Sequence, residues 1–240
     1  SQNPRGRPGG KTPRGGRMPG ARKEGGGGAP GAALHRAAAG GDAAGVAAAL
    51  RRGAPADVAG GGDDGAAPLW RAARGGHAGV VRTLLEAGAQ VDRIREYSGT
   101  TPLHAAAEGG HLDVVRTLLE AGAGAGVAAP DGTTPVWWAA ADGHTAVIQA
   151  LLTAGADPDA TMADTGASPL FMAAQGGHLA AVEALVAGGA DVRAARLDNG
   201  ASPLAGACAG DHVRVVQVLL AAGAEVDAVP AGGLLTPLLV

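Results

Sequence analysis

Five histidines recur along the chain at intervals of 33 or 34 residues, and histidine can serve as a metal ligand or as a proton carrier. They are His77, His111, His144, His178 and His212. Zinc ligands lie about 2 Å from one ion, whereas stacked helices are separated by about 8–10 Å. Equivalent histidines on stacked units therefore cannot share a metal, and we expect each ring to hydrogen-bond the loop backbone before a helix. The sequence implies no metal and no other cofactor.

The other residues that could do chemistry also lack a catalytic arrangement. Cys208 is the one cysteine, and its only nearby base is His212. Its neighbour Ala207 indicates a helix face of small residues, so a buried structural thiol is favoured over a nucleophile. Lys11 follows a glycine as in a phosphate-binding loop, but Arg5 stands where that motif has its first glycine. We therefore expect a protein that is not an enzyme.

Four bulky rings occupy equivalent places, each two residues after a proline in a regular series. They are Trp70, His104, Trp137 and Phe171. Aromatic residues make up only 2% of the chain, so these rings could stack on one another and supply bulk to an alanine-rich core. They could instead form a stripe that anchors a partner, because aromatic residues are favoured at interface hot spots. Both interpretations stay open.

Acidic residues fall at the tips of predicted turns, where aspartate is favoured for local reasons. They are Asp63, Asp64, Glu96, Asp131, Asp164 and Asp198. Residues 32–240 carry 12 basic and 21 acidic side chains, a net charge of −9. If the acidic residues lined one edge of the molecule, their summed field would favour a basic partner.

The elements that position these residues repeat with a fixed period. Successive prolines of the series are 34, 33, 34, 34 and 34 residues apart. They are Pro68, Pro102, Pro135, Pro169, Pro203 and Pro237. Glycines and the five histidines keep the same rhythm, and a period near 33 predicts a stacked solenoid.

One unit shows how the local structure arises. Thr101 is placed to cap a helix that begins at Pro102, where the missing N–H costs nothing. Residues 109–110, both glycine, end this helix after about two turns. A second helix follows with an apolar stripe at 114, 115, 118 and 119, and Gly122 ends it. No unit can bury its stripe alone, so each needs its neighbours.

The segments Thr101–Ala106 (TPLHAA), Gly110–Leu112 (GHL) and Leu118–Ala123 (LLEAGA) resemble the ankyrin repeat. The resemblance implies an all-α ankyrin-repeat solenoid of helix-turn-helix units of 33–34 residues, joined by β-turn or hairpin loops. We expect a degenerate first repeat at 32–57, five full repeats over about 58–228 and a truncated repeat at 229–240.

Two departures from the repeat pattern predict local weakness. Ala67 stands where other units have a capping hydroxyl, which should weaken that helix start by about 1 kcal/mol. Residues 122–126 hold three glycines and lack the usual aspartate, so we expect the loosest junction there.

Residues 1–31 differ from the rest, with seven basic residues against one acidic residue and many glycines and prolines. Such a segment cannot bury enough apolar surface to offset its chain entropy, so we expect a disordered tail. A basic linker, weak nucleic-acid binding and organellar targeting all fit its composition.

The net charge, the number of cysteines and the length of the apolar runs exclude other classes of protein. A net charge of −3 over 240 residues gives no overall attraction to nucleic acid. One cysteine allows no intramolecular disulfide, and no apolar run reaches the roughly 18 residues of a membrane span. We expect a monomer in the cytoplasm or nucleus that does not insert into membranes.

The resemblance implies a non-catalytic protein-protein interaction module whose partner meets the concave face, made of turn tips and the exposed side of the first helices. Besides the four rings, the positions expected there are Asp64, Tyr97, Ser98, Thr100, Glu108, Asp131, Thr133, Asp142, Asp164, Thr165, Gln175, Asp198 and Asn199. The alternative is a regulatory or targeting segment of a larger kinase, ligase or channel whose active domain lies outside these 240 residues.

Overall fold

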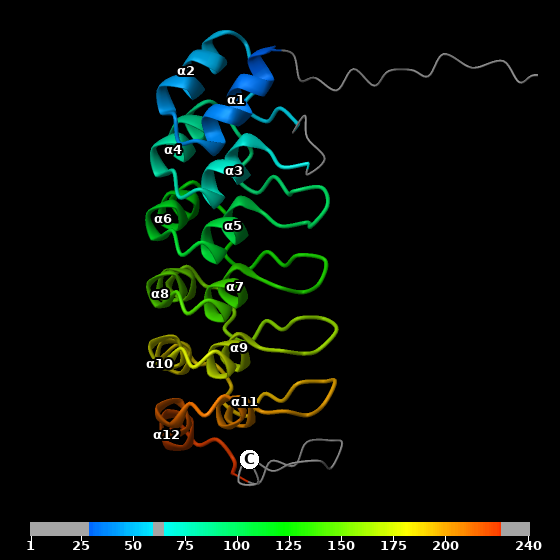
Figure 1. The fold of residues 1–240 in the computed structure, drawn as a ribbon, viewed down its shortest axis with the longest axis vertical. Coiled ribbons are helices and arrows are strands. Elements are labelled where there is room, and N and C mark those ends of the chain that lie inside the picture. The colour runs from blue at the N-terminus through cyan, green and yellow to red at the C-terminus, as the bar shows by residue number, and fades with distance from the viewer. Residues whose placement is uncertain (1–28, 60–64, 227–240) are drawn as a thin grey trace, which may run out of the picture.

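The computed structural model describes residues 29–59 and 65–226, and these form stacked pairs of helices (Figure 1). The first helices of the pairs are α1 (Ala29–Ala39), α3 (Pro68–Arg74), α5 (Pro102–Glu108), α7 (Pro135–Ala141), α9 (Pro169–Gln175) and α11 (Pro203–Ala209). The second helices are α2 (Ala43–Arg51), α4 (Ala78–Glu86), α6 (Leu112–Glu120), α8 (Thr145–Thr153), α10 (Leu179–Ala187) and α12 (Val213–Ala221). The described residues contain helices and loops, which confirms the all-α solenoid.

The described residues include only some of the expected domain boundaries. Helix α1 begins at Ala29, slightly before the expected start of the repeat domain at residue 32. The tail expected to be disordered lies, up to residue 28, outside the described residues. The truncated repeat expected at 229–240 lies outside them as well.

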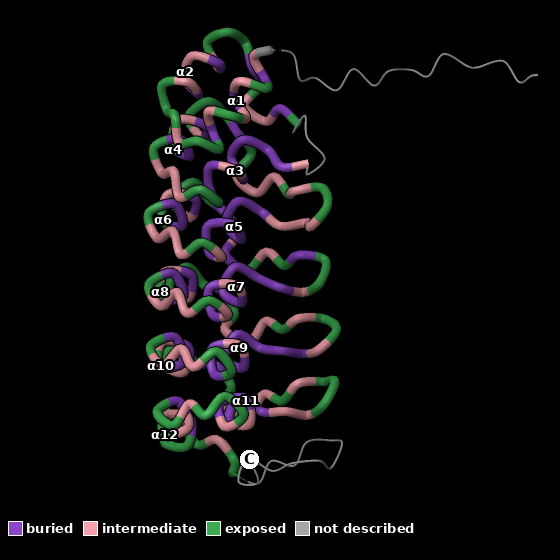
Figure 2. Tube along the Cα trace, viewed as in Figure 1, coloured by how far each residue is buried: buried purple, intermediate pink, exposed green. Residues whose placement is uncertain are grey.

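The helices form two layers, with the loops projecting from the side of the first helices (Figure 1). First helices contact the first helices of the neighbouring units, and second helices do the same. The buried residues run along the interface of the two layers, while the loop tips are exposed (Figure 2). From α4 to α12, each second helix places one leucine in this interface with no exposed surface, as Leu118 shows in α6.

The first helices differ in whether a side chain caps their first turn. Ser168 and Ser202 accept hydrogen bonds from the backbone N–H of the residue three positions on, at 3.1 and 3.2 Å. Ala67 makes no such bond, which confirms the uncapped start of α3. Thr134 also leaves α7 without a side-chain cap, and its buried hydroxyl has no hydrogen-bond partner among the described residues.

The five periodic histidines connect neighbouring units. Each Nε2 lies 3.0–3.1 Å from a backbone carbonyl at the end of the preceding unit's first helix. The expected backbone hydrogen bond is therefore confirmed, but the acceptor lies on the neighbouring unit and not in the histidine's own loop. His111, for example, contacts the Arg74 carbonyl and packs on Gly76, where a Cβ would lie 2.7 Å from Nδ1. Asp211 (φ 56°) takes the place of that glycine before α12 and is the only described non-glycine residue with positive φ.

Aspartates form a second set of connections between units. Asp57 accepts a hydrogen bond from the Gln90 N–H at 3.0 Å, and Asp159 accepts one from the Asp191 N–H at 2.9 Å. Asp92 binds the N–H of residue 124 in the same way at 3.2 Å. At the corresponding position of the next unit stands Gly126, which has no side chain to offer. The loop predicted to be weak therefore lacks one specific contact between units.

Replacing Gly126 by aspartate should restore that contact and raise the free energy of unfolding by about 1 kcal/mol more than Gly126→Ala does. The site has room, because no atom lies within 4 Å of a Cβ placed there. The alanine variant is the control, since it removes only the extra chain entropy that glycine gives the unfolded state. Urea unfolding measures both variants, and hydrogen exchange over residues 122–132 should slow in the aspartate variant alone. Equal stabilities would contradict the prediction.

Candidate protein-binding face

The loops between units are short hairpins, and in each a backbone hydrogen bond of 2.8–3.1 Å joins the first and last residues while a second of 2.8–3.0 Å lies within the turn. The described hairpins are 95–100, 129–133, 162–167 and 196–201. The second of them is one residue shorter than the others. Together with the exposed side of the first helices, the hairpins form the surface that we call the hairpin face.

Polar side chains at one turn position shape the hairpins. Asp131 accepts hydrogen bonds from the Thr133 N–H at 3.0 Å and from its hydroxyl at 2.6 Å. Asn199 accepts the Ala201 N–H at 2.9 Å, and Ser98 and Thr165 make longer bonds of this kind. These predicted site residues therefore stabilise the turn conformation through their own side chains.

Backbone bonds also join neighbouring hairpins. The Asp131 carbonyl accepts the Ala163 N–H at 2.7 Å, and the Thr165 carbonyl accepts the Leu197 N–H at 2.8 Å. These bonds help to align the hairpins in one row (Figure 1). Pro130, which packs against Gly99, has no N–H to donate to the preceding hairpin.

The four equivalent rings lie beneath this row. Trp70, His104, Trp137 and Phe171 are only 1–8% exposed. Trp70 Nε1 donates to Thr100 Oγ1 at 3.2 Å, and Trp137 Nε1 donates to the Ala167 carbonyl at 2.9 Å. Each of these two rings thus connects its helix to the following hairpin.

Neither sequence interpretation of the rings describes them fully. Among the described residues the only two aromatic rings in contact are Trp137 and Trp138, with centroids 5.4 Å apart, so the four rings do not stack on one another. Their burial also leaves little ring surface for a partner. They fill the junction between first helices and hairpins.

His104 has the most complete set of contacts of the four. The Thr101 N–H donates to Nδ1 at 3.1 Å, so Nδ1 is an acceptor and Nε2 carries the proton that points to the Thr133 carbonyl at 3.3 Å. Desolvation by burial lowers the pKa of His104, although the Thr133 carbonyl and the charges of Asp131 and Asp92 act in the opposite direction. The imidazole is therefore held in the neutral form.

This lowered pKa predicts a loss of stability in mild acid. Below about pH 6.5 the unfolded chain protonates the imidazole, whereas the folded protein keeps His104 neutral down to its lowered pKa. The unfolded state then binds more protons, so unfolding becomes easier as the pH falls, by at most about 1.4 kcal/mol per pH unit. Urea unfolding from about pH 7.5 to about pH 5.5 should show a smaller loss in His104→Gln, which keeps every other histidine. Equal losses would contradict the assignment.

The surface of the hairpin face comes from positions one residue after the buried rings and at the ends of the first helices. Trp138 and Met172 are half-buried, and Arg74 and Gln175 are exposed. Trp138 Nε1 donates to the Thr133 hydroxyl at 3.2 Å. Trp138, Met172 and Arg74 are not among the positions expected from the sequence; the signal available was their place in the helix close to residues recognised as buried.

A small pocket of about 160 Å³ opens on this face between α3, α5 and α7. Ala105, which is buried, leaves the space that larger residues occupy in the flanking units. The guanidinium groups of Arg74 and Arg95 both lie over the Trp70 ring, 5.5 and 4.7 Å from its centroid. The remaining lining residues are Ser98, Thr100, His104, Glu108 and Trp138.

The acidic residues of the hairpins differ in position and in environment. Glu96, Asp131 and Asp164 are exposed, but they stand six, four and five residues before the proline of their units, so they do not occupy one register. Asp198 is hydrogen-bonded and ion-paired to Arg196, which lowers the pKa of its carboxyl. The predicted acidic row is therefore irregular, and the negative charge of one of its members, Asp198, is offset by Arg196.

The other predicted site residues fall into three groups. Tyr97, Asp142, Gln175 and Asn199 are exposed, while Glu108, Ser98, Thr100 and Thr165 are half-buried. Thr133 is 1% exposed, so its side chain is not accessible to a partner. Asp64, like Asp63, lies outside the described residues.

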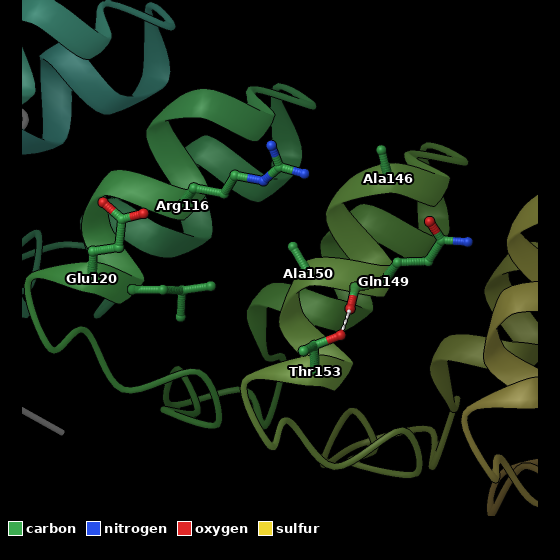
Figure 3. A pocket seen from close by; sticks show the side chains of 7 residues that line it. Arg116, Glu120, Ala146, Gln149, Ala150 and Thr153 are labelled. Atoms are coloured by element: carbon green, nitrogen blue, oxygen red, sulfur yellow. Dashed lines mark hydrogen bonds between the residues drawn. The ribbon is translucent and has the colours of Figure 1, made fainter.

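The described ranges hold no group of three or more His, Cys, Asp or Glu side chains able to bind a metal. Cys208 is half-buried and not fully buried as expected, because it lies in the last described first helix, and partial burial raises the pKa of its thiol. On the second-helix side, an open pocket of about 450 Å³ lies between α6 and α8, lined by Arg116, Glu120 and Gln149 among others (Figure 3).

The stacked units and the hairpin face define a helical-repeat protein. A sequence model for ankyrin repeats (three copies) matches residues 34–131, 91–162 and 136–229, and the chain belongs to the ankyrin repeat family. Ankyrin repeats are generally protein-protein interaction modules. None of the described helices combines the length and the apolar character needed to cross a bilayer.

Solved structures agree with this assignment. The crystal structure of the human ASB11 ankyrin repeat domain is 27% identical, with a TM-score of 0.77, over 86% of this chain and 90% of that chain. No curated protein matches the chain. Because 549 chains of solved structures match, the likeness establishes the fold and leaves the partner open.

Proposed function

We propose that the chain is a non-catalytic domain that binds a protein partner on the hairpin face. The observation that carries this proposal is Trp138, whose ring is half-buried on that face beside a pocket although a second tryptophan, Trp137, already fills the interior next to it. A partly exposed tryptophan next to a cavity is typical of interface hot spots. The exposed Tyr97 (74%) on a hairpin adds further apolar surface.

The charges of the hairpin face support a partner with basic groups toward the C-terminal units. Asp142 and Asp164 are exposed there, whereas Arg74 lies toward the N-terminal units. The second candidate function, a regulatory or targeting segment of a larger enzyme or channel, uses the same surface, and sequencing the complete reading frame distinguishes the two. A single half-buried cysteine requires no oxidising compartment, which supports a cytoplasmic or nuclear location.

Two variants, each with two substitutions, test the binding face in a pull-down from cell extract. The first combines Trp138→Ala with Gln175→Arg on the hairpin face, and the second combines Arg116→Glu with Gln149→Arg on the second-helix side. The amount of partner captured by the first variant should fall by about tenfold or more, because truncation of a hot-spot residue costs at least about 2 kcal/mol of binding free energy. The second should retain them. The opposite pattern would overturn the proposed face, and circular dichroism checks that both variants fold.

A further inference from the structure

The unit of α7 and α8 departs from the repeat at two positions of the hairpin face. Trp138 has the largest side chain at its position, and Asp142 stands at the end of the first helix, where every other described unit has glycine. The five glycines are Gly40, Gly75, Gly109, Gly176 and Gly210. Because Trp138 and Asp142 are four residues apart, their side chains share one face of α7.

The glycine at the end of a first helix makes room for the histidine two residues later. A Cβ at Gly75 would lie 2.5 Å from Nε2 of His77. Asp142 carries such a Cβ, and the backbone adapts to it, with φ of −100° against −80° at Gly75. Asp142 is exposed, and no ion pair within the described ranges includes it. A residue that departs from a local packing rule without a compensating contact points to a function.

Glu108 brings a second carboxylate to the same place. His144 follows Asp142 by two residues, and its Nε2 lies 3.0 Å from the Glu108 carbonyl oxygen, so the end of α5 is held beside the end of α7. Glu108 also lines the small pocket together with Trp138. Among the described residues its carboxylate takes part in no ion pair either. Two unmatched negative charges therefore lie near one indole ring.

The Trp138 ring is held in one orientation. Its Nε1 donates to the Thr133 hydroxyl at 3.2 Å, and this hydroxyl donates to the Asp131 carboxylate at 2.6 Å. Trp137 packs edge-on against it, with the ring centroids 5.4 Å apart. The residue is half-buried, so part of the ring meets solvent. A cation over the face of an indole ring is attracted by its π electrons, and tryptophan is the best ring for this contact.

The arginines that line the pocket approach a different ring. Arg74 and Arg95 lie 5.5 and 4.7 Å from the centroid of Trp70, which belongs to α3. Helix α5 stands between α3 and α7 in the stack (Figure 1). The charge of the hairpin face thus changes from positive at α3 to negative at the end of α7.

We infer that α7 carries a subsite for one basic side chain of the partner: an arginine lies over the exposed part of Trp138, and Glu108 and Asp142 match its charge. A guanidinium is favoured over an ammonium, because it is planar and stacks on aromatic rings. Met172, half-buried at the equivalent position of α9, offers apolar surface to the stem of that arginine. This inference rests on the proposed function and names the chemistry of its partner.

The test begins with a selection of random linear peptides against the full 240-residue chain. Enriched peptides should share an arginine. Replacing that arginine by citrulline, which has nearly the same shape but no charge, should weaken the binding of one such peptide by about tenfold. Titration calorimetry measures both peptides, and added salt should reduce the difference between them.

The same two peptides on variant chains locate the arginine. On a double variant with Glu108→Gln and Asp142→Asn, their affinities should differ by about twofold or less, because the matching charges are removed while the side-chain shapes are kept. Glu120→Gln, an exposed position on the second-helix side, is the control and should keep the tenfold difference. Comparing two peptides on one chain cancels any general effect of a substitution on folding.

The outcomes separate the two proposals. Enriched peptides without a shared arginine, or with an arginine whose replacement costs as much on the double variant as on the original chain, overturn the subsite. The proposed function stands in that case if Trp138→Ala with Gln175→Arg abolishes their binding. Peptides that tolerate this change but are lost with Arg116→Glu and Gln149→Arg overturn both proposals, as does the absence of any enriched peptide.

Discussion

Replacing Leu118 by alanine should lower the free energy of unfolding by about 2–5 kcal/mol, because truncation of a fully buried leucine leaves a cavity as well as removing apolar contacts. Leu118 has no exposed surface and lies in α6, between α4 and α8. Solenoid stability is approximately a sum of units and nearest-neighbour interfaces, so damage to one central unit weakens both of its interfaces. Urea unfolding followed by circular dichroism should show the loss and a second, separate transition.

Leu220→Ala is the matched control. Leu220 belongs to the same repeat position as the half-buried Leu119 but is 41% exposed in α12. Its truncation should cost less than about 1 kcal/mol, because much of its surface already meets solvent. A comparable loss in the two variants would contradict the packing described for the layers.

Replacing His104 by alanine should cost about 3 kcal/mol, although the residue is neither catalytic nor apolar. The change removes a ring that is 1% exposed and leaves both the Thr101 N–H and the Thr133 carbonyl without their partner in the interior. Each buried polar group left unpaired costs about 1–3 kcal/mol. Thermal or urea unfolding of the full chain measures the effect.

The control for this prediction is His111→Ala. Among the described residues the His111 side chain makes one hydrogen bond, to the Arg74 carbonyl at 3.0 Å, and the residue is half-buried. Loss of that bond should cost only about 1 kcal/mol. If both histidine variants were equally destabilised, the two buried hydrogen bonds of His104 would not have the stabilising effect described for them.

Local features of the fold could be predicted from the sequence because the signals are local. The start of a first helix at Pro102 and the left-handed Gly122 after a second helix follow from backbone geometry at single residues. The period then places the same elements in every unit.

The hairpin face was harder to predict, because it depends on contacts between units. Trp137 and Trp138 are adjacent in sequence, and only the position of the next hairpin decides which of them is covered. The hairpin 129–133 is one residue shorter than its neighbours, so counting along the sequence suggested an acidic row that the structure does not align. The ion pair between Asp198 and Arg196 depends on the geometry of their hairpin, so the sequence alone does not show that this acidic charge is offset.

The close packing of Gly76 against His111 has a consequence for engineering the length of the array. Because each such glycine meets the histidine of the following unit, whole units can be inserted, removed or exchanged as blocks only where a glycine faces the incoming histidine. Asp211 breaks that rule at α12, since its Cβ would occupy the space that an incoming histidine ring needs. A unit copied from α9–α10 and fused after α12 should therefore dock only when Asp211 is first changed to glycine.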